Sequence, residues 1–290
     1  MNRSLSLRGA RRGPSSGARW AVALQVVLLA ALGVVWIYPF LWLLSASLKG
    51  ALEIFVSGLN LIPQEWQWSN YARAWDDAGF SGYMLNSVIV TVACVLIVVI
   101  RCALTGYVLA RYNFIGKRLL LGIFVATIFV PAGYTIIAVV ELSNRLGLLN
   151  SHLGIILALS GGGHVAAVLL YAGYFSRIPR ELEEAAVLDG ASFLQVFRTV
   201  MLPLAGPVTA TVSILTFLTT WNAFFVPLVF TFSRPDLRTL AVGMLAFRGE
   251  HSTDWSGLAA AATISLIPVA LLFLFLQRYF IEGVAGAVKS

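Results

Sequence analysis

Residues 179–207 read PRELEEAAVLDGASFLQVFRTVMLPLAGP, a long polar stretch between two hydrophobic regions of the chain. Pro179 suits the first position of a helix, where the N–H that proline lacks has no partner within the helix. Three glutamates follow near the positive end of the predicted helix dipole. Asp189-Gly190 is predicted to end this helix, because glycine tolerates the left-handed conformation that follows many helix ends.

A second short helix is predicted directly after this glycine. Ser192 and Gln195 have the spacing of a capping box, and the helix is predicted to end before Pro203. Its apolar residues recur with helical spacing at Phe193, Val196, Phe197, Val200 and Met201. Because a helix this short is marginal by itself in water, another surface must cover its apolar face.

The rest of the chain is strongly apolar. Hydrophobic residues make up 59% of its 290 residues, against roughly 45–50% in ordinary soluble domains, and the mean hydropathy is +0.86. A membrane-spanning helix needs about 20 mainly apolar residues and satisfies its backbone internally. Six stretches qualify, at residues 20–44, 84–110, 119–140, 153–175, 207–232 and 258–277. We therefore expect an all-α membrane protein with six transmembrane helices.

Positive charge predicts the orientation of these helices. Lys and Arg gather in residues 1–19, in the loop after the second helix and in the polar stretch 179–207, whereas the first loop on the other side is net acidic. Both termini and the polar stretch are therefore predicted to be cytoplasmic, in a multi-pass protein of the plasma membrane surrounded by lipid. The net charge of +7 follows from this topology and requires no nucleic-acid partner.

The polar stretch also resembles the coupling signature of ABC-importer permeases. That signature is E-A-A, three residues, Gly, nine residues, an aliphatic residue, one residue, then Leu-Pro. It is matched here by Glu184-Ala185-Ala186, Gly190, Val200 and Leu202-Pro203. In that family the hairpin fits a groove on a cytoplasmic ATPase. The resemblance therefore implies that the ATPase-coupling residues are Glu184, Ala185, Ala186, Asp189, Gly190, Leu202 and Pro203.

Further motifs are similar to carbohydrate-uptake permeases, and the tail 286–289, GAVK, resembles the maltose-type second permease. This implies a type I importer bundle with a cytoplasmic coupling hairpin. The expected parts are a disordered basic tail at 1–19, the first helix and external loop at 20–80, the type-1 permease core at 81–277 and a cytoplasmic tail at 278–290. The fourth predicted helix departs from relatives at Ser160-Gly161-Gly162-Gly163, where proline is commoner, which leaves its shape open.

The same resemblance implies the partners of the chain. They are a second, related permease in a heterodimer, a cytoplasmic ABC ATPase dimer and an extracytoplasmic solute-binding protein. The chain lacks the phosphate-binding pattern G-x-x-x-x-G-K-[ST], so no cofactor is expected in it and ATP-Mg is assigned to the partner ATPase. We find no catalytic or metal-ligating constellation. A secondary transporter or channel working without an ATPase stays as the alternative, and a membrane-embedded enzyme is disfavoured.

Two intramembrane features are candidates for the solute pathway. Polar residues recur along the fifth predicted helix beside an aromatic ring, at Thr209, Ser213, Thr216, Thr220, Trp221 and Asn222. They are candidate pore-lining residues, since sugars need hydrogen bonds and an aromatic face. The alternative is that they serve helix packing. Arg101 in the second helix is interpreted as snorkelling to the cytoplasmic interface or as bound to a structural partner.

The external loop 233–257, between the fifth and sixth predicted helices, is too long for a tight connector. It is rich in charge and carries an aromatic residue, which suits transient docking. In maltose-type relatives the matching loop docks on the binding protein. The candidate docking residues are Phe247, Arg248, Glu250 and Asp254. The alternative is a solvated connector.

Overall fold

A computed structural model describes residues 16–130, 132–249 and 252–288. Within this part of the chain the regular structure is helical, with one isolated β-bridge between Arg248 and Thr253. The α-helices are α1 (Ser16–Ala46), α2 (Glu53–Val56), α3 (Ser69–Ala72), α4 (Phe80–Arg111), α5 (Lys117–Ile128), α6 (Ala132–Arg145), α7 (His152–Gly161), α8 (Val165–Phe175), α9 (Glu181–Leu188), α10 (Phe193–Val196), α11 (Leu202–Leu204), α12 (Gly206–Trp221), α13 (Phe225–Phe230), α14 (Leu240–Gly243) and α15 (Trp255–Val288). Four short segments have other helical geometry: η1 (Arg73–Asp77) and η2 (Phe197–Met201) are π-helical, and η3 (Pro235–Leu237) and η4 (Met244–Phe247) are 3₁₀.

Helix α4 forms the centre of the bundle and packs against α7, α8 and α12. Its buried side includes Cys94, Cys102 and Tyr107, none of which is exposed. Gly106 allows α4 and α8 to approach closely, because a Cβ at this position would lie 2.5 Å from the Cβ of Tyr171. The two cysteines are free and buried, as small apolar packing residues are.

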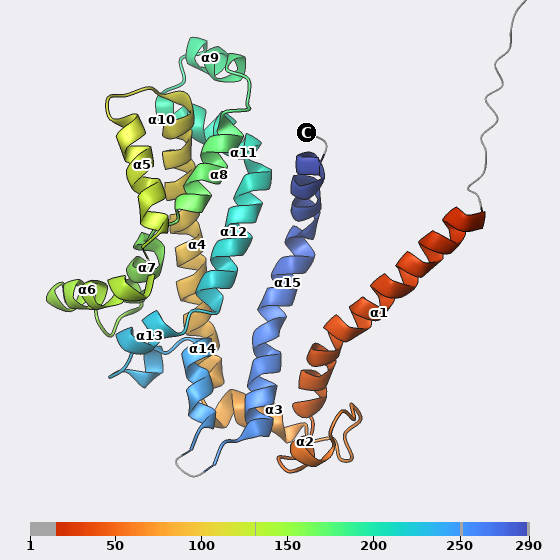
Figure 1. Cartoon of the computed structure of the whole chain (residues 1–290). Coiled ribbons are helices and arrows are strands. Elements are labelled where there is room, and N and C mark those ends of the chain that lie inside the picture. Colours follow the sequence, from red (N-terminus) through yellow and green to blue (C-terminus); the bar gives the residue numbers. More distant parts are fainter. Residues whose placement is uncertain (1–15, 131, 250–251, 289–290) are drawn as a thin grey trace, which may run out of the picture.

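The long first, second and sixth predicted spans are confirmed as helices able to cross a membrane. They correspond to Val22–Ala46, Phe80–Arg111 and Trp255–Phe275. The backbone of α15 is helical to Val288 and so includes residues 278–288. Figure 1 shows α1 leaning away from the bundle toward its N-terminal end.

Six continuous spans are not confirmed in the described part of the chain. The described residues have three helices of sufficient length and hydropathy, or up to five if each bent helix pair counts as one span. The predicted third span is divided into α5 and α6, and α6 turns sideways in Figure 1. The sequence has Pro131 at this junction, and a proline disfavours the helical conformation of the residue before it.

The fourth and fifth predicted spans are also interrupted. Helices α7 and α8 meet at 57°, around the glycine run 161–163, because glycine is a poor helix former. Helix α12 ends at Trp221, and the short helix α13 follows separately. At the end of α12 the Leu218 carbonyl accepts from the Asn222 side chain at 2.8 Å and from the Asn222 backbone N–H at 3.2 Å.

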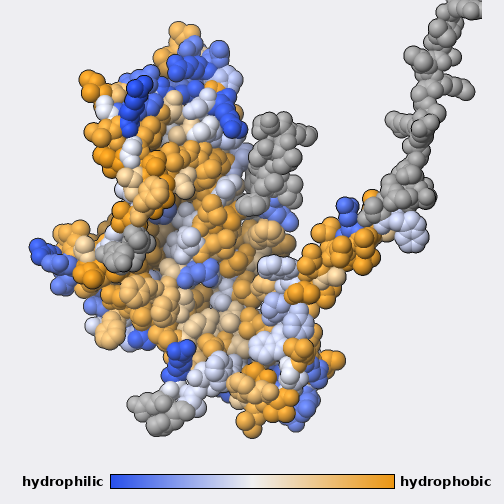
Figure 2. All heavy atoms as spheres, in the orientation of Figure 1, coloured by the Kyte–Doolittle hydropathy of each residue, from blue (hydrophilic) through white to orange (hydrophobic). Residues whose placement is uncertain are grey.

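The two ends of the bundle carry different structures (Figure 1). Helix α9 and the hairpin around it lie at one end of α4, and α2, α3 and the chain before α15 lie at the other. On the face shown in Figure 2, hydrophobic residues predominate between these ends, and hydrophilic residues gather over the α9 hairpin. This distribution fits a bundle whose sides face lipid.

Candidate functional site

The turn inside the polar stretch is confirmed. Helix α9 ends at Leu188, and Gly190 has φ +86°, the left-handed conformation that glycine adopts without steric cost. The N–H of Gly190 donates to the Val187 carbonyl at 2.9 Å. Helix α9 starts at Glu181, two residues after the predicted start at Pro179. The three glutamates therefore lie in its first turn, where the helix dipole favours negative charge.

The second helix begins with the predicted Ser192–Gln195 interaction, in which the Ser192 N–H donates to Gln195 Oε1 at 2.7 Å. Its apolar face is buried by this chain itself, with Val196, Phe197 and Met201 at most 7% exposed. They pack in one cluster with residues of α4 and α8. Tyr107 of α4 also stacks on Phe193, with ring centroids 5.3 Å apart. The hairpin is thus built into the bundle.

The predicted end before Pro203 is wrong. The chain stays helical to Leu204 through the π-helical segment η2, in which the Leu202 N–H donates to the Phe197 carbonyl five residues earlier. The wider π turn comes directly before Pro203, a residue with no N–H to continue the α-helical pattern. The chain then bends by 81° into α12.

An ion pair that the sequence did not reveal joins the hairpin to α4. The Arg111 Nε lies 3.1 Å from a carboxylate oxygen of Glu183, with side chains 5% and 16% exposed. The hydroxyl of Tyr107 donates to the other carboxylate oxygen at 2.6 Å. Arg111 also donates to the Ile178 carbonyl at 2.7 Å. Glu183 is therefore the anchor of α9, next to the signature residue Glu184, which is exposed.

The outer side of the hairpin stays exposed and apolar. Its exposed side chains are Leu182 (45%), Val187 (57%), Leu188 (88%) and Leu194 (64%). An adjoining groove of about 440 Å³ is lined by residues of α9 together with the end of α4: Arg111, Tyr112, Arg180, Glu183, Glu184, Val187 and Leu188. Of the predicted coupling residues, Ala186 and Leu202 pack against the core, whereas Ala185, Asp189 and Pro203 are exposed.

The candidate pore residues lie mostly inside this chain. Thr216 and Thr220 are buried, at 4% and 9% exposure, and Thr209 and Ser213 are half-buried. Thr209 accepts a hydrogen bond from the Tyr171 hydroxyl at 2.9 Å. Trp221 is 4% exposed, and its Nε1 donates to the Ser265 carbonyl of α15 at 3.2 Å. Of the six residues, Asn222 alone is exposed. Full or partial burial of the other five within this chain favours helix packing over pore lining as their role.

The external loop 233–257 is largely folded onto the bundle. Asn86 of α4 donates to the carbonyls of Asp236 and Arg238, at 2.8 and 2.9 Å, and Ser87 Oγ accepts from the Leu240 N–H. Of the candidate docking residues, Phe247 is buried (5% exposed), Arg248 is exposed, and Glu250 lies outside the described residues. The buried Phe247 ring contacts Phe80 with centroids 6.2 Å apart.

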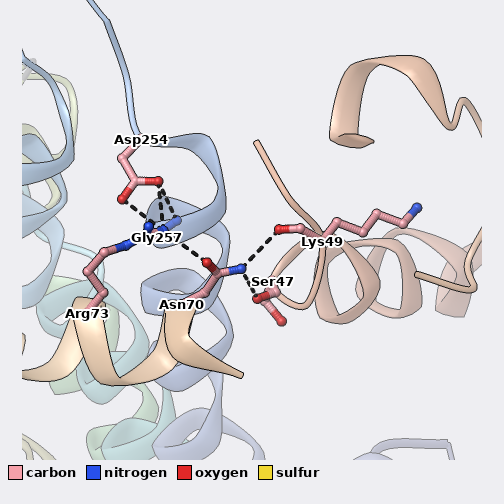
Figure 3. Close-up of polar contacts among 6 residues, drawn as sticks. All are labelled: Ser47, Lys49, Asn70, Arg73, Asp254 and Gly257. Atoms are coloured by element: carbon pink, nitrogen blue, oxygen red, sulfur yellow. Dashed lines mark hydrogen bonds and ion pairs between the residues drawn. The ribbon is translucent and has the colours of Figure 1, made fainter. Parts of the chain in front are cut away.

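Asp254 takes part in a network at this end of the molecule (Figure 3). Its Oδ1 accepts from the Gly257 N–H at 2.9 Å, in the first turn of α15, and its carboxylate pairs with Arg73 at 3.3 Å. Arg73 in turn donates to Asn70 Oδ1 at 2.9 Å. Asn70 is buried, and its amide donates to the carbonyls of Ser47 and Lys49, both at 3.0 Å (Figure 3).

Lys49 is buried at this end of the molecule, at 1% exposure. Its ammonium donates to Ser57 Oγ at 2.9 Å and to the Asn60 carbonyl. These bonds close the loop that contains α2. The network of Asn70, Arg73 and Asp254 then ties that loop to the start of α15.

Comparison with known proteins agrees with this geometry. Residues 102–286 match the family of the binding-protein-dependent transport system inner membrane component. The chain therefore belongs to this family of ABC-importer permease subunits, which are transport components rather than catalytic enzymes. The resemblance to carbohydrate-uptake permeases is confirmed.

Individual relatives match over most of their length. The diacetylchitobiose uptake system permease protein NgcG of Streptomyces coelicolor is 36% identical over 97% of this chain and 91% of its own. The probable ABC transporter permease protein YurM of Bacillus subtilis is 36% identical over 87% of this chain and 84% of its own. A chain in the crystal structure of a bacterial ABC transporter that imports the acidic polysaccharide alginate superposes with a TM-score of 0.79. It is 25% identical, over 93% of this chain and 99% of that one.

Proposed function

We propose that this chain is the transmembrane permease subunit of an ATP-driven sugar importer. In this proposal it forms half of the translocation pathway and receives the motion of a cytoplasmic ATPase through the α9 hairpin. Sugar as the solute class is supported by relatives named for diacetylchitobiose uptake and for alginate import. Membership of the permease family supports the coupling role.

The observation that carries the proposal is the two-sided construction of the hairpin. One side is fixed to α4 by the Glu183–Arg111 pair and by buried apolar residues. The other side presents Val187, Leu188 and Leu194 to solvent beside a groove. Exposed apolar residues at a polar end of a protein mark interaction surfaces. A partner bound there could move α4 through a direct ion pair rather than through a flexible loop.

The other partners follow from the same proposal. Helix α1 has an apolar surface and contacts α15 of this chain near its external end, which supports a second permease subunit, together with lipid, beside its remaining length. The hairpin and both termini are assigned to the cytoplasm. An extracytoplasmic binding protein docks at the opposite end, where Arg248 is exposed and Trp255 is 46% exposed. ATP-Mg belongs to the partner ATPase, and the chain itself needs no cofactor.

Affinity purification of the tagged chain in mild detergent tests this function. We expect an ATPase subunit and a second permease to co-purify, and ATP hydrolysis in proteoliposomes to rise when loaded binding protein is added. Solute uptake by this chain purified without any ATPase would instead support the secondary-transporter alternative and contradict the proposal.

A further inference from the structure

The break in the fourth predicted span leaves irregular backbone on the surface of this chain. Helix α7 ends at Gly161 and α8 begins at Val165, with a 57° bend between them. The glycines at 161, 162 and 163 are exposed, and a Cβ added to any of them would meet no atom within 4 Å. These glycines therefore face open space rather than a packed neighbour.

Arg101 of α4 binds this break directly. Its Nη1 donates to the Gly161 carbonyl at 3.1 Å, and its Nη2 donates to the Gly162 carbonyl at 3.3 Å and contacts His164 Nδ1 at 2.9 Å. The same Nδ1 also lies 2.5 Å from the Gly162 carbonyl oxygen, so His164 joins the guanidinium to the break. Arg101 therefore has a structural partner in this chain, as one of the two sequence interpretations expected.

The positive charge of Arg101 has no carboxylate partner. None of the ion pairs in the described part of the chain includes Arg101, whose side chain is exposed. Both Nη atoms of Arg101 contact the break, and the residue stays exposed, so a further acceptor can reach the guanidinium. The described part of the chain supplies no carboxylate to this positive charge.

The cluster formed by Arg101 and the break lies too deep in the membrane to have lipid as its neighbour. Helix α4 has 32 residues, about 48 Å, and Arg101 lies about 8 Å from its midpoint. A hydrocarbon core about 30 Å thick centred on α4 would therefore include the cluster. Exposed irregular backbone and an ionised side chain are tolerated at such depth only against protein or a water-filled cavity.

We propose that the cluster of Arg101, Gly161, Gly162 and His164 lines the aqueous translocation pathway and contacts an anionic group of the passing solute. This inference rests on the proposed importer function and narrows its substrate class to carbohydrates that carry a carboxylate, sulfonate or phosphate group. Guanidinium groups bind such oxygens with short, charge-assisted hydrogen bonds.

Charge-selective labelling of a reporter cysteine tests the site. Gly163→Cys is introduced with Cys94→Ala and Cys102→Ala, and the assembled complex is reacted in proteoliposomes with an anionic or a cationic methanethiosulfonate reagent. Gln64→Cys in the external loop is the reference, because it gives the ratio of the reaction rates of the anionic and cationic reagents at a position outside the site. We expect the reporter to favour the anionic reagent by about fivefold or more after this correction, since a nearby positive charge acts with opposite sign on the two reagents.

Two further variants separate charge from structure. Arg101→Lys should keep the preference for the anionic reagent, and Arg101→Met should abolish it in a complex that elutes normally by size exclusion. If the reporter is unreactive in the assembled complex, the break is covered and the inference is wrong. The inference would also be wrong if the reporter preferred the anionic reagent equally in the protein that keeps Arg101 and in the Arg101→Met variant. The labelling rates do not depend on solute uptake. Failure of an ATPase to co-purify would therefore contradict only the proposed function.

The solute class is tested on the cognate binding protein. A thermal-shift screen that pairs neutral oligosaccharides with their carboxylated, sulfonated and phosphorylated counterparts should return an anionic ligand. A binding protein stabilised by neutral sugars alone would contradict the anionic assignment, whatever the labelling shows.

Discussion

The guanidinium of Arg111 and the carboxylate of Glu183 lie 3.1 Å apart and join the central helix α4 to the hairpin helix α9. Both side chains are largely removed from solvent, and Tyr107 binds the same carboxylate. In this arrangement a displacement of α9 is carried to α4 by a charged contact as well as by apolar packing. A buried charge left without its partner is costly, so the two residues act as a unit.

Glu183→Gln should weaken this link while keeping the size of the side chain. We expect a loss of about 2 kcal/mol in the stability of the complex, the usual range for a hydrogen bond to a charged group. Uptake should fall further than ATP hydrolysis, because the hairpin can still bind the ATPase. Thermal unfolding and uptake in proteoliposomes measure the two effects.

The matched control is Glu181→Gln, an exposed glutamate of the same helix turn, which should unfold like the unmodified protein. If Glu183→Gln and Glu181→Gln behave alike, the ion pair has no special role. A double-mutant cycle with Arg111→Gln then gives the coupling energy directly.

Gly190→Val should abolish transport while the subunit still inserts in the membrane. Gly190 has φ +86°, and no neighbour would touch an added Cβ, so the cost comes from the backbone conformation alone. A left-handed conformation costs an ordinary residue about 1–2 kcal/mol, and a β-branched one is strongly disfavoured there. Gly190→Asn is the control, since asparagine tolerates this region. Wild-type uptake by a well-expressed valine variant would show that the turn is not needed.

At the end of the bundle opposite the hairpin, Asn70→Ala should destabilise the protein more than Arg73→Met. Asn70 is buried, and its loss leaves the Ser47 and Lys49 carbonyls without their side-chain donor, at a cost of about 1–3 kcal/mol. The Arg73–Asp254 pair is more than a third exposed on both sides and is worth about 1 kcal/mol or less. Thermal unfolding of the two variants in the same detergent decides the order, and the reverse order would contradict this assignment.

The predicted orientation is tested by single cysteines at opposite ends of the bundle, in the Cys94→Ala, Cys102→Ala background. Gln64→Cys should react with an impermeant thiol reagent in intact cells, whereas Arg198→Cys on the hairpin should react only after the cells are opened. Both positions are exposed, so access depends on the side of the membrane alone. Labelling of Arg198→Cys in intact cells would place the hairpin outside.

Capping and turn preferences of residues close in sequence were sufficient to predict the hairpin. The left-handed turn at Gly190 and the Ser192–Gln195 interaction each depend on residues close in sequence, and both are present. The Glu183–Arg111 pair could not be predicted, because it joins residues that only the packing of α9 on α4 brings together. The same limit explains why Phe247, expected to dock on a partner, is buried against Phe80.

Hydropathy predicted where apolar helices occur but not where they bend. A window of about 20 apolar residues has the same mean hydropathy whether it forms one straight helix or two bent ones. The glycine run 161–163 indicated a possible departure in the fourth span, and the 57° bend lies there. The partners of Arg101 come from that bend, so they depend on a feature that composition does not contain.

Site-specific cross-linking from the hairpin tests the proposed coupling most directly. A photoreactive amino acid replaces Leu188, which is 88% exposed on the hairpin, or Leu59, which is 78% exposed at the opposite end. After irradiation of living cells, the Leu188 position should yield a covalent adduct with a protein that carries the G-x-x-x-x-G-K-[ST] nucleotide-binding motif, identified by mass spectrometry, and the Leu59 position should not. An adduct with that ATPase from Leu59, or none from Leu188 in a complex that still transports, would contradict the proposal that α9 is the coupling element.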